Sequence, residues 1–246
     1  MCLITFYFEP KQKLVLAANR DEYFVRPAAP LHQWDNGLVA GQDLKEGGTW
    51  LGLNPERRLV ALTNVRVLGV APENPPSRGQ LVTELLLGEK PLEQALSELL
   101  ARARVYAPFN IIAGDINQLW YLTNYPEPTL QSIPAGTHAL SNAQLNTPWP
   151  KAELAKYQLN QWLQKTSDLA TLPRLLNTRH TFPDHLLPNT GVPKILERML
   201  SAQFIHTPSY GTRCSTALMI TPQQTQITEI TWNEAGNEAG TVVIKL

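Results

Sequence analysis

Residues 13–30, KLVLAANRDEYFVRPAAP, join an apolar run to a cluster of charges, and the rest of the chain is best understood from this junction. The run 14–18 is rich in β-forming residues, and the tetrapeptide NRDE (19–22) follows it directly. An earlier apolar run, 2–8, is separated from it by EPKQ (9–12), which is typical of a turn between antiparallel strands. The pattern predicts an N-terminal β-hairpin whose second strand ends in charged residues. Those charges form either a solvated turn or the floor of a functional site.

Length and charge exclude several classes of protein. The chain has 246 residues and a formal net charge of zero, so it can bury the core of one layered domain and has no basic surplus for nucleic acid. No apolar run reaches the length of a membrane span, and no basic leader precedes the first apolar run. We expect a single domain over residues 1–246 that is cytoplasmic, with both cysteines, Cys2 and Cys214, reduced.

Strands are predicted at both ends of the chain and helices between them. The β-like segments are 2–8, 13–19, 37–43, 49–54, 58–65, 109–115, 118–124, 214–221, 225–232 and 240–246. Helical spacing of apolar residues occurs in 78–88, 91–103 and 149–165, and more briefly in 169–177 and 192–204. The expected buried stripe of 149–165 is Leu154, Leu159, Trp162 and Leu163. This segregation favours an α+β fold over alternating βαβ units.

Common catalytic and metal-binding motifs are absent from the sequence. There is no G-x-x-x-x-G-K-[ST], no H-E-x-x-H, no C-x-x-C and no G-x-S-x-G. Among the scattered histidines, His180 and His185 lie close together, but in a proline-containing loop without a third ligand. We therefore expect no metal site.

Cys2 is the first candidate for chemistry. Aminopeptidases remove an initiator methionine before a small side chain, which would leave Cys2 with both a thiol and a free α-amine. With a reference pKa of about 7.7–8.0, that amine can act as a general base beside its own nucleophile. The alternative is that Cys2 is a small hydrophobic residue at the start of a strand.

The charged tetrapeptide supports the first interpretation. If the two N-terminal strands pair antiparallel, Arg20 and Asp21 lie beside Cys2. A guanidinium there favours the thiolate, and a carboxylate there holds the α-ammonium. Once Met1 is removed, we expect the charges of Arg20 and of the adjacent α-ammonium to depress the pKa of Cys2. We also expect Arg20 and Asp21 to be partly buried.

Seven short segments then make the sequence resemble a known family. They are MCL, ANRDE, GGTWLG, LTNVR, PSRGQLV, LSNAQLNTPWPK and YGTRCST. Together they resemble the NRDE family, also called the transport and Golgi organisation family. The resemblance implies the N-terminal nucleophile (Ntn) hydrolase fold, a four-layer αββα sandwich of two antiparallel sheets. A more distant likeness is to choloylglycine hydrolases and penicillin V acylases.

The resemblance also implies a set of site residues. They are Cys2 as nucleophile, Asp21 holding the amine, Asn142 and Asn64 stabilising an oxyanion, and Arg20 and Arg213 balancing charge. Each has an alternative: Asn64 and Asn142 as turn residues near strand ends, and Arg213 as a surface residue. The remaining expectations are structural, with a turn at Gly47 and Gly48, core positions for Trp50, Trp149 and Trp162, and a structural thiol at Cys214.

Two functions follow from the sequence. The first is an amidohydrolase that cleaves a linear C–N amide bond and requires no cofactor. The second is a non-catalytic carrier or chaperone on the same scaffold, which the resemblance links to haem or to an acyl-CoA or lipid ligand. Both place a small molecule, not nucleic acid, in the site. The first also requires removal of Met1.

Overall fold

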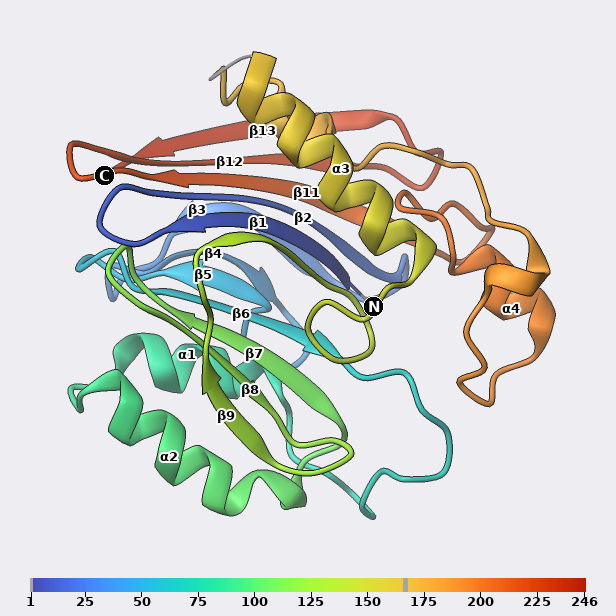
Figure 1. Cartoon of the computed structure of the whole chain (residues 1–246), viewed down its shortest axis with the longest axis horizontal. Helices are drawn as coiled ribbons and strands as arrows, with labels where there is room; N and C mark the ends of the chain where they lie inside the picture. Colours follow the sequence, from blue (N-terminus) through green and yellow to red (C-terminus); the bar gives the residue numbers. More distant parts are fainter. Residues whose placement is uncertain (1, 166–167) are drawn as a thin grey trace.

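Two antiparallel β-sheets are stacked against each other in the computed structural model, with helices on their outer faces (Figure 1). The structure describes residues 2–165 and 168–246. The first sheet has the strand order β10-β1-β2-β11-β12-β13, and the second runs from β3 to β9 in chain order. Since the two chain ends share the first sheet, residues near the N-terminus meet residues more than 180 positions away.

The strands of the first sheet are β1 (Cys2–Glu9), β2 (Lys13–Tyr23), β10 (Gly136–Leu140), β11 (Tyr210–Ile220), β12 (Thr225–Trp232) and β13 (Glu238–Lys245). Those of the second are β3 (Ala28–Gln33), β4 (Val39–Asp43), β5 (Leu51–Leu53), β6 (Leu59–Asn64), β7 (Phe109–Gly114), β8 (Leu119–Thr123) and β9 (Thr129–Ser132).

Helices cover the outer face of each sheet. The α-helices are α1 (Gly79–Leu87), α2 (Leu92–Arg102), α3 (Pro150–Lys165) and α4 (Lys194–Met199), and the short 3₁₀ helices are Ala103–Val105, Leu172–Arg174 and Asp184–Leu186. Helices α1 and α2 pack on the second sheet and α3 on the first (Figure 1). The predicted α+β, four-layer αββα sandwich is therefore confirmed. None of the described helices is both long and apolar enough to cross a membrane.

The strand periodicity of two divides the core into layers. Even-numbered residues of β2, such as Leu14 and Leu16, face the second sheet and join the core between the sheets. Odd-numbered residues, such as Val15 and Ala17, face α3 and pack against Leu159. Each side chain of β2 therefore belongs to one of two different environments.

The predicted hairpin is present, but its second strand is longer than expected. Cys2 lies opposite Arg20 in the pairing of β1 and β2. Strand β2 continues to Tyr23, because β11 pairs with its other edge and places Tyr210 opposite Tyr23. The charged tetrapeptide is therefore part of a central strand, and its interpretation as a solvated turn is wrong.

Several elements differ from their predicted extents. Strands β3, β9 and β10 were not predicted, because short segments next to prolines show little alternation. The segments 169–177 and 192–204 form only a 3₁₀ turn and the six residues of α4. On α3, Leu159 and Trp162 are buried as predicted, whereas Leu154 and Leu163 are only half-buried. Ala152, Ala155 and, unexpectedly, Lys151 fill the buried stripe instead.

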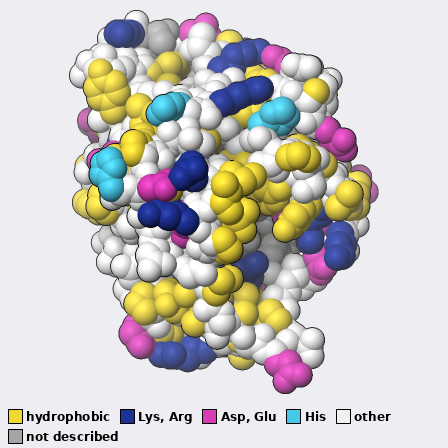
Figure 2. Space-filling model, turned by 90° about the vertical axis from the view of Figure 1, so that its right-hand side faces the viewer, with side chains coloured by type: hydrophobic (Ala, Val, Ile, Leu, Met, Phe, Trp, Pro, Cys, Tyr) yellow, Lys and Arg dark blue, Asp and Glu magenta, His cyan; other side chains and the backbone are white. Residues whose placement is uncertain are grey.

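Helix α4 is attached to the protein by charge rather than by an apolar face. Its buried side chain is Glu197, which pairs with Arg66 at 2.7 Å. Ile195 and Leu196 are exposed by 61% and 42%. Figure 2 shows the side of the molecule that carries α4, where hydrophobic side chains gather near the centre beside Lys and Arg.

Candidate active site

The start of β1 and the far part of β2 together form one wall of a cavity. The cavity has a volume of about 310 Å³ and contains Cys2, Arg20, Asp21 and Asn64 in its lining. The other lining residues are Glu22, Arg26, Asp43, Glu46, Gly48, Thr49, Trp50, Leu62, Pro75, Pro76, Ser77, Arg78, Gly79 and Ala107. Four of the six predicted site residues therefore lie around one space.

Arg20 is held on the side of β2 that faces the second sheet. Its guanidinium carbon lies 4.3 Å from the centre of the Trp50 ring, and Nη2 lies 3.7 Å from an Asp43 carboxylate oxygen. The side chain is 6% exposed, as expected for a buried charge with partners. Its Nη1 atom is buried and has no hydrogen-bond partner among the described residues.

Cys2 lies at the cavity wall, but its thiol is not acidified. The residue is partly exposed, and burial of the thiol raises its pKa above the ordinary value. The charge of Arg20 and the backbone N–H of Asp21 act in the opposite direction without overcoming burial. With Met1 attached, the strands that bring Arg20 close also remove water from the sulfur, and the depressed pKa expected for a chain that begins at Cys2 stays a prediction.

Asp21 is directed toward α3, on the opposite side of β2 from Arg20. Its Oδ1 accepts a hydrogen bond of 2.7 Å from the Thr212 hydroxyl, and its backbone carbonyl accepts one of 3.0 Å from Tyr210. The carboxyl is 1% exposed, and burial raises its pKa, while the positive charge of Lys151 lowers it. The expectation that Arg20 and Asp21 are buried is confirmed.

The two asparagines are linked to each other. Asn64 lines the cavity, whereas Asn142 lies behind it and donates through Nδ2 to the Asn64 carbonyl at 2.8 Å. Asn142 is 1% exposed. The geometry therefore favours Asn64 over Asn142 as a direct donor to a ligand, and gives Asn142 the position of a support.

Arg213 lies outside the cavity lining. Its Nη1 donates to the carbonyl oxygens of Tyr23, Phe24 and Arg26 at 3.0–3.1 Å. The side chain thus closes the turn that follows β2. The family resemblance brought Arg213 into the site, but its guanidinium binds the carbonyls that follow β2 instead.

Some cavity residues were missed by sequence reasoning. Trp50 packs against the core between the sheets as predicted but also lines the cavity, and Trp149 and Trp162 are buried as predicted. Arg78, in the segment PSRGQ, also lines the cavity and donates to the Pro108 carbonyl at 2.9 Å. No composition signal separates Arg78 from a surface arginine, since its position depends on how the loop returns to α1.

Gly48 allows the cavity wall to close. A Cβ atom at this position would lie 2.5 Å from the carbonyl carbon of Gly79, which is closer than real Cβ contacts. The expected turn at Gly47 is present, with a φ of 77°. Within residues 2–165 and 168–246, no group of three or more His, Cys, Asp or Glu side chains is placed to hold a metal ion. The predicted removal of Met1 lies outside the described residues.

Comparison with known proteins agrees with this architecture. The family model described as Transport and Golgi organisation 2 matches residues 1–234. A human protein, "Transport and Golgi organization protein 2 homolog", is 33% identical over 249 residues, covering 89% of this chain and 88% of its own. A structure of conjugated bile acid hydrolase from Clostridium perfringens, an Ntn hydrolase, has a TM-score of 0.52 at 12% identity, covering 99% of this chain and 97% of that one. The chain therefore belongs to the Transport and Golgi organisation 2 family and has an Ntn-hydrolase-like fold.

Proposed function

We propose that the protein is an N-terminal-cysteine hydrolase that cleaves a linear amide C–N bond. The observation that carries this proposal is the position of Cys2, opposite Arg20 in the strand pairing and in the wall of a 310 Å³ cavity. A nucleophile, a cation and an amide donor, Asn64, thus surround one space large enough for a small ligand. The similar solved structure is named a hydrolase, and that activity is carried to this chain only as part of the proposal.

In the proposed reaction, the Cys2 sulfur attacks the amide carbonyl carbon, and the thiol proton passes to the α-amine of Cys2. The carbonyl oxygen becomes an oxyanion that accepts a hydrogen bond from the Asn64 side chain. The C–N bond then breaks, and the ammonium returns its proton to the leaving amine. Water attacks the resulting thioester and releases the carboxylic acid and the free thiol. The backbone N–H of Asp21 acts on the Cys2 thiol, and in the proposed reaction the Asp21 carboxylate holds the ammonium between steps.

The cavity also limits the substrate. Its volume is near the lower limit of the volumes usual for ligand-binding pockets. Its lining combines charged side chains with apolar surface from Trp50, Leu62 and Pro75. These features favour a short or aromatic acyl amide with polar groups over a long unbranched acyl chain. The unpartnered Nη1 of Arg20 would bind a carbonyl or carboxylate oxygen of that substrate.

A panel of N-acyl amides of different chain length, incubated with wild type, Cys2→Ala and Cys214→Ser, tests the proposal. Cys2→Ala should lose at least about 1,000-fold in kcat/KM, as removal of a nucleophile does elsewhere, whereas Cys214→Ser should stay near wild type. Intact-mass measurement should detect an acyl adduct on wild type and on Cys214→Ser but not on Cys2→Ala.

Parallel titrations with haemin and with an acyl-CoA address the carrier alternative. If no amide is cleaved and wild type and Cys2→Ala bind one of these ligands equally tightly, the hydrolase proposal fails and the carrier function replaces it. If hydrolysis depends on Cys2, the carrier function is not needed to explain the cavity.

A further inference from the structure

Helix α1 begins at the cavity, with an arginine at its positive end. Ser77, Arg78 and Gly79 line the cavity, and Arg78 is the N-cap residue of the helix. No described side chain caps this end, and the first turn carries no acidic residue. Because the helix dipole places partial positive charge at the N-terminus, a cation there is unfavourable and an anion is stabilised. The start of α1 therefore lacks the negative charge that its position favours.

The backbone adds donors at the same end of the helix. The N–H groups of Gly79 and Gln80 make no hydrogen bond to another described residue, as is usual for the first positions of a helix. Gly48, also in the cavity lining, lies so close that a Cβ there would be 2.9 Å from the Gln80 nitrogen. Glycine at positions 48 and 79 therefore brings bare backbone, rather than side chains, to this part of the cavity wall.

Arg78 has a hydrogen-bond partner but no counter-charge. Its Nη1 donates to the Pro108 carbonyl oxygen at 2.9 Å, which directs the guanidinium without balancing its charge. Within residues 2–165 and 168–246, no carboxylate forms an ion pair with Arg78, and its other nitrogens donate to no residue. This guanidinium in the cavity wall therefore has donors left for a ligand.

The acidic residues of the cavity lining are directed elsewhere. Asp43 accepts a hydrogen bond of 2.7 Å from Arg26, and Glu22 accepts one of 2.8 Å from the backbone N–H of the next residue. Asp21 is directed toward α3, and Glu46 is exposed. The lining thus contains acids, but none of them neutralises the start of α1.

Arg20 independently indicates a ligand with negative charge. It is 6% exposed and lines the same cavity, and its Nη1 has no hydrogen-bond partner among the described residues. Its nearest carboxylate, Asp43, lies 3.7 Å away and is closer to Arg26, at 2.7 Å. A buried guanidinium that is incompletely paired is costly unless something else compensates it.

We propose that Arg78 and the N-terminus of α1 form a subsite for a carboxylate, so that the amide cleaved at Cys2 is an anion. This inference deepens the proposed function and rests on it for the bond that is cleaved. Since four acidic side chains share the lining, one negative charge is favoured over a dianion such as phosphate. The carboxylate can belong to the acyl part or to the amine part of the substrate, and the experiment below separates the two.

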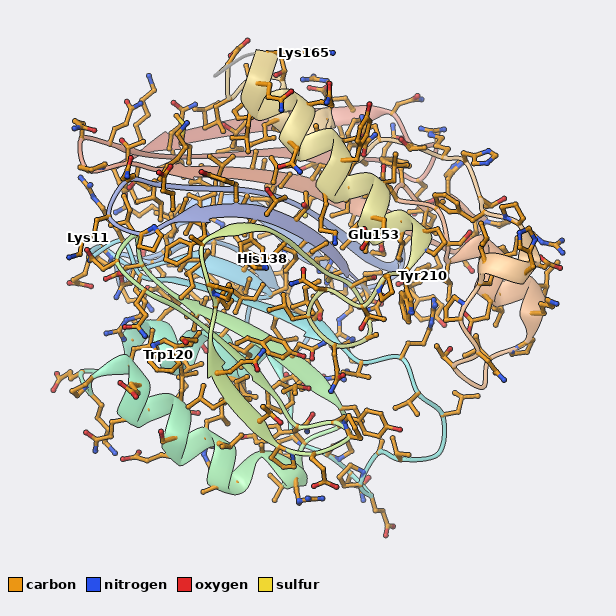
Figure 3. All side chains as sticks on the ribbon, in the orientation of Figure 1. Lys11, Trp120, His138, Glu153, Lys165 and Tyr210 are labelled. Atoms are coloured by element: carbon orange, nitrogen blue, oxygen red, sulfur yellow. The ribbon has the colours of Figure 1, made fainter. Side chains whose placement is uncertain are left out.

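Arg58 provides a matched control at the other end of α1. It is also half-buried, and its Nη1 donates to the carbonyl oxygens of Leu85 and Gly88 at 2.9 and 3.1 Å. A cation there agrees with the helix dipole and needs no ligand. Arg58 lines a separate depression with Trp120. Figure 3 labels Trp120 on the left and Tyr210, which pairs with the end of β2, on the right.

The test is an NMR titration that follows the backbone amide resonance of Gly79. The probes are N-acetylglycine, with its carboxylate on the amine side, and succinamic acid, with its carboxylate on the acyl side. Their neutral counterparts are N-acetylglycinamide and succinamide. Cys2→Ala protein is used throughout, so that cleavage cannot consume the probes. We expect at least one anion to bind about tenfold more tightly than its neutral counterpart and to shift the Gly79 resonance.

Substitutions in the same background complete the test. Arg78→Gln should lose the preference for the anion, Arg78→Lys should keep part of it, and Arg58→Gln should keep it in full. Equal binding of anion and neutral amide, absence of saturable anion binding, or an unchanged preference in Arg78→Gln would each overturn the inference. If Arg78→Gln does not fold, the comparison of anion with neutral amide needs no change at position 78 and still decides.

Binding and cleavage can fail separately. If no cleavage depends on Cys2 but the anion preference depends on Arg78, the subsite stands and only the hydrolase proposal fails. If hydrolysis is present, Arg78→Gln should raise KM for an anionic amide about tenfold with little change in kcat, and should leave a neutral amide unaffected. An equal loss of kcat for both substrates would show that Arg78 supports the structure of the site rather than binding a carboxylate.

Discussion

The two cysteines flank the same arginine, yet they lie in different environments. Cys2 and Cys214 both stand opposite Arg20, one on β1 and the other on β11. Cys2 is partly exposed in the cavity wall, whereas Cys214 is buried. Burial raises the pKa of both thiols, and for Cys214 it raises the pKa well above the ordinary value, with Glu229 adding to the effect.

The two cysteines therefore differ in their access to the cavity rather than in the direction of their pKa shifts. Both sulfurs experience the positive charge of Arg20, which lowers their pKa values but does not overcome burial. Only Cys2 faces a space that can hold a ligand. The expectation that Cys214 is a structural thiol agrees with its burial.

The largest expected effect comes from removing the arginine between the thiols. Arg20→Ala leaves Asp43 without one of its two cations and leaves a hole beside Trp50. We expect a loss of about 3 kcal/mol in the free energy of unfolding, measured by urea denaturation. Arg104→Ala removes an exposed pair with Glu127 and should cost less than about 1 kcal/mol. Equal losses for the two variants would show that Arg20 is not a buried structural charge.

The pH dependence of Cys2 alkylation is the next largest effect. With Met1 attached, burial raises the pKa of Cys2, and the thiolate is then a minor form at neutral pH. Its fraction, and with it the alkylation rate, should therefore rise about tenfold per pH unit from pH 6.5 to 8.5 without a plateau, a span of about 100-fold. A plateau below pH 7 in iodoacetamide kinetics would restore the depressed pKa that the sequence suggested.

The sequence alone predicts the surroundings of Cys2 in part, but not those of Cys214. The apolar runs of β1 and β2 and the short turn between them are local signals, and they fix the pairing of Cys2 with Arg20. The pairing of Arg20 with Cys214 is not local, because β11 lies about 190 residues away. Without that third strand, the charges at 19–22 could not be distinguished from a turn, and the burial that raises the Cys2 pKa could not be foreseen.

The family resemblance supplied the site residues that lie on strands, but not those that depend on loop paths. Asn64 ends β6 and reaches the cavity as implied. Trp50 and Arg78 lie in the irregular segments just before β5 and just before α1, and no periodicity encodes the paths of such segments. Lys151 was overlooked for the opposite reason, because a charged residue in an amphipathic helix is normally assigned to the exposed face.

A smaller effect is expected from a substitution in the cavity wall, which should change the alkylation of Cys2 but not that of the buried Cys214. Gly48→Ala introduces a Cβ that contacts the backbone of Gly79, so we expect a loss of about 1–3 kcal/mol and slower alkylation of Cys2. Alkylation of Cys214 should not change. Gly240→Ala, where a Cβ meets open space, is the control and should leave Cys2 alkylation at the wild-type rate. The same slowing in Gly240→Ala would remove the link between Gly48 and the cavity.

The smallest effect is expected at Glu229. This buried carboxylate raises the pKa of Cys214, so Glu229→Gln should lower that pKa. If access controls reactivity, native Cys214 should nevertheless remain unlabelled by iodoacetamide in Glu229→Gln. Rapid labelling of Cys214 in the folded variant, verified by an unchanged melting curve, would mean that charge rather than access protects this thiol.

The most direct test of Cys2 as the nucleophile determines both the first residue of the mature chain and the reactivity of the two thiols. Native protein is treated with substoichiometric iodoacetamide at pH 7.5, and peptide mass spectrometry identifies the N-terminal residue and the alkylated cysteine. We expect an N-terminal peptide that begins at Cys2 and carries the label, with Cys214 unmodified. A peptide that begins at Met1, with Cys2 labelled no faster than Cys214, would contradict it.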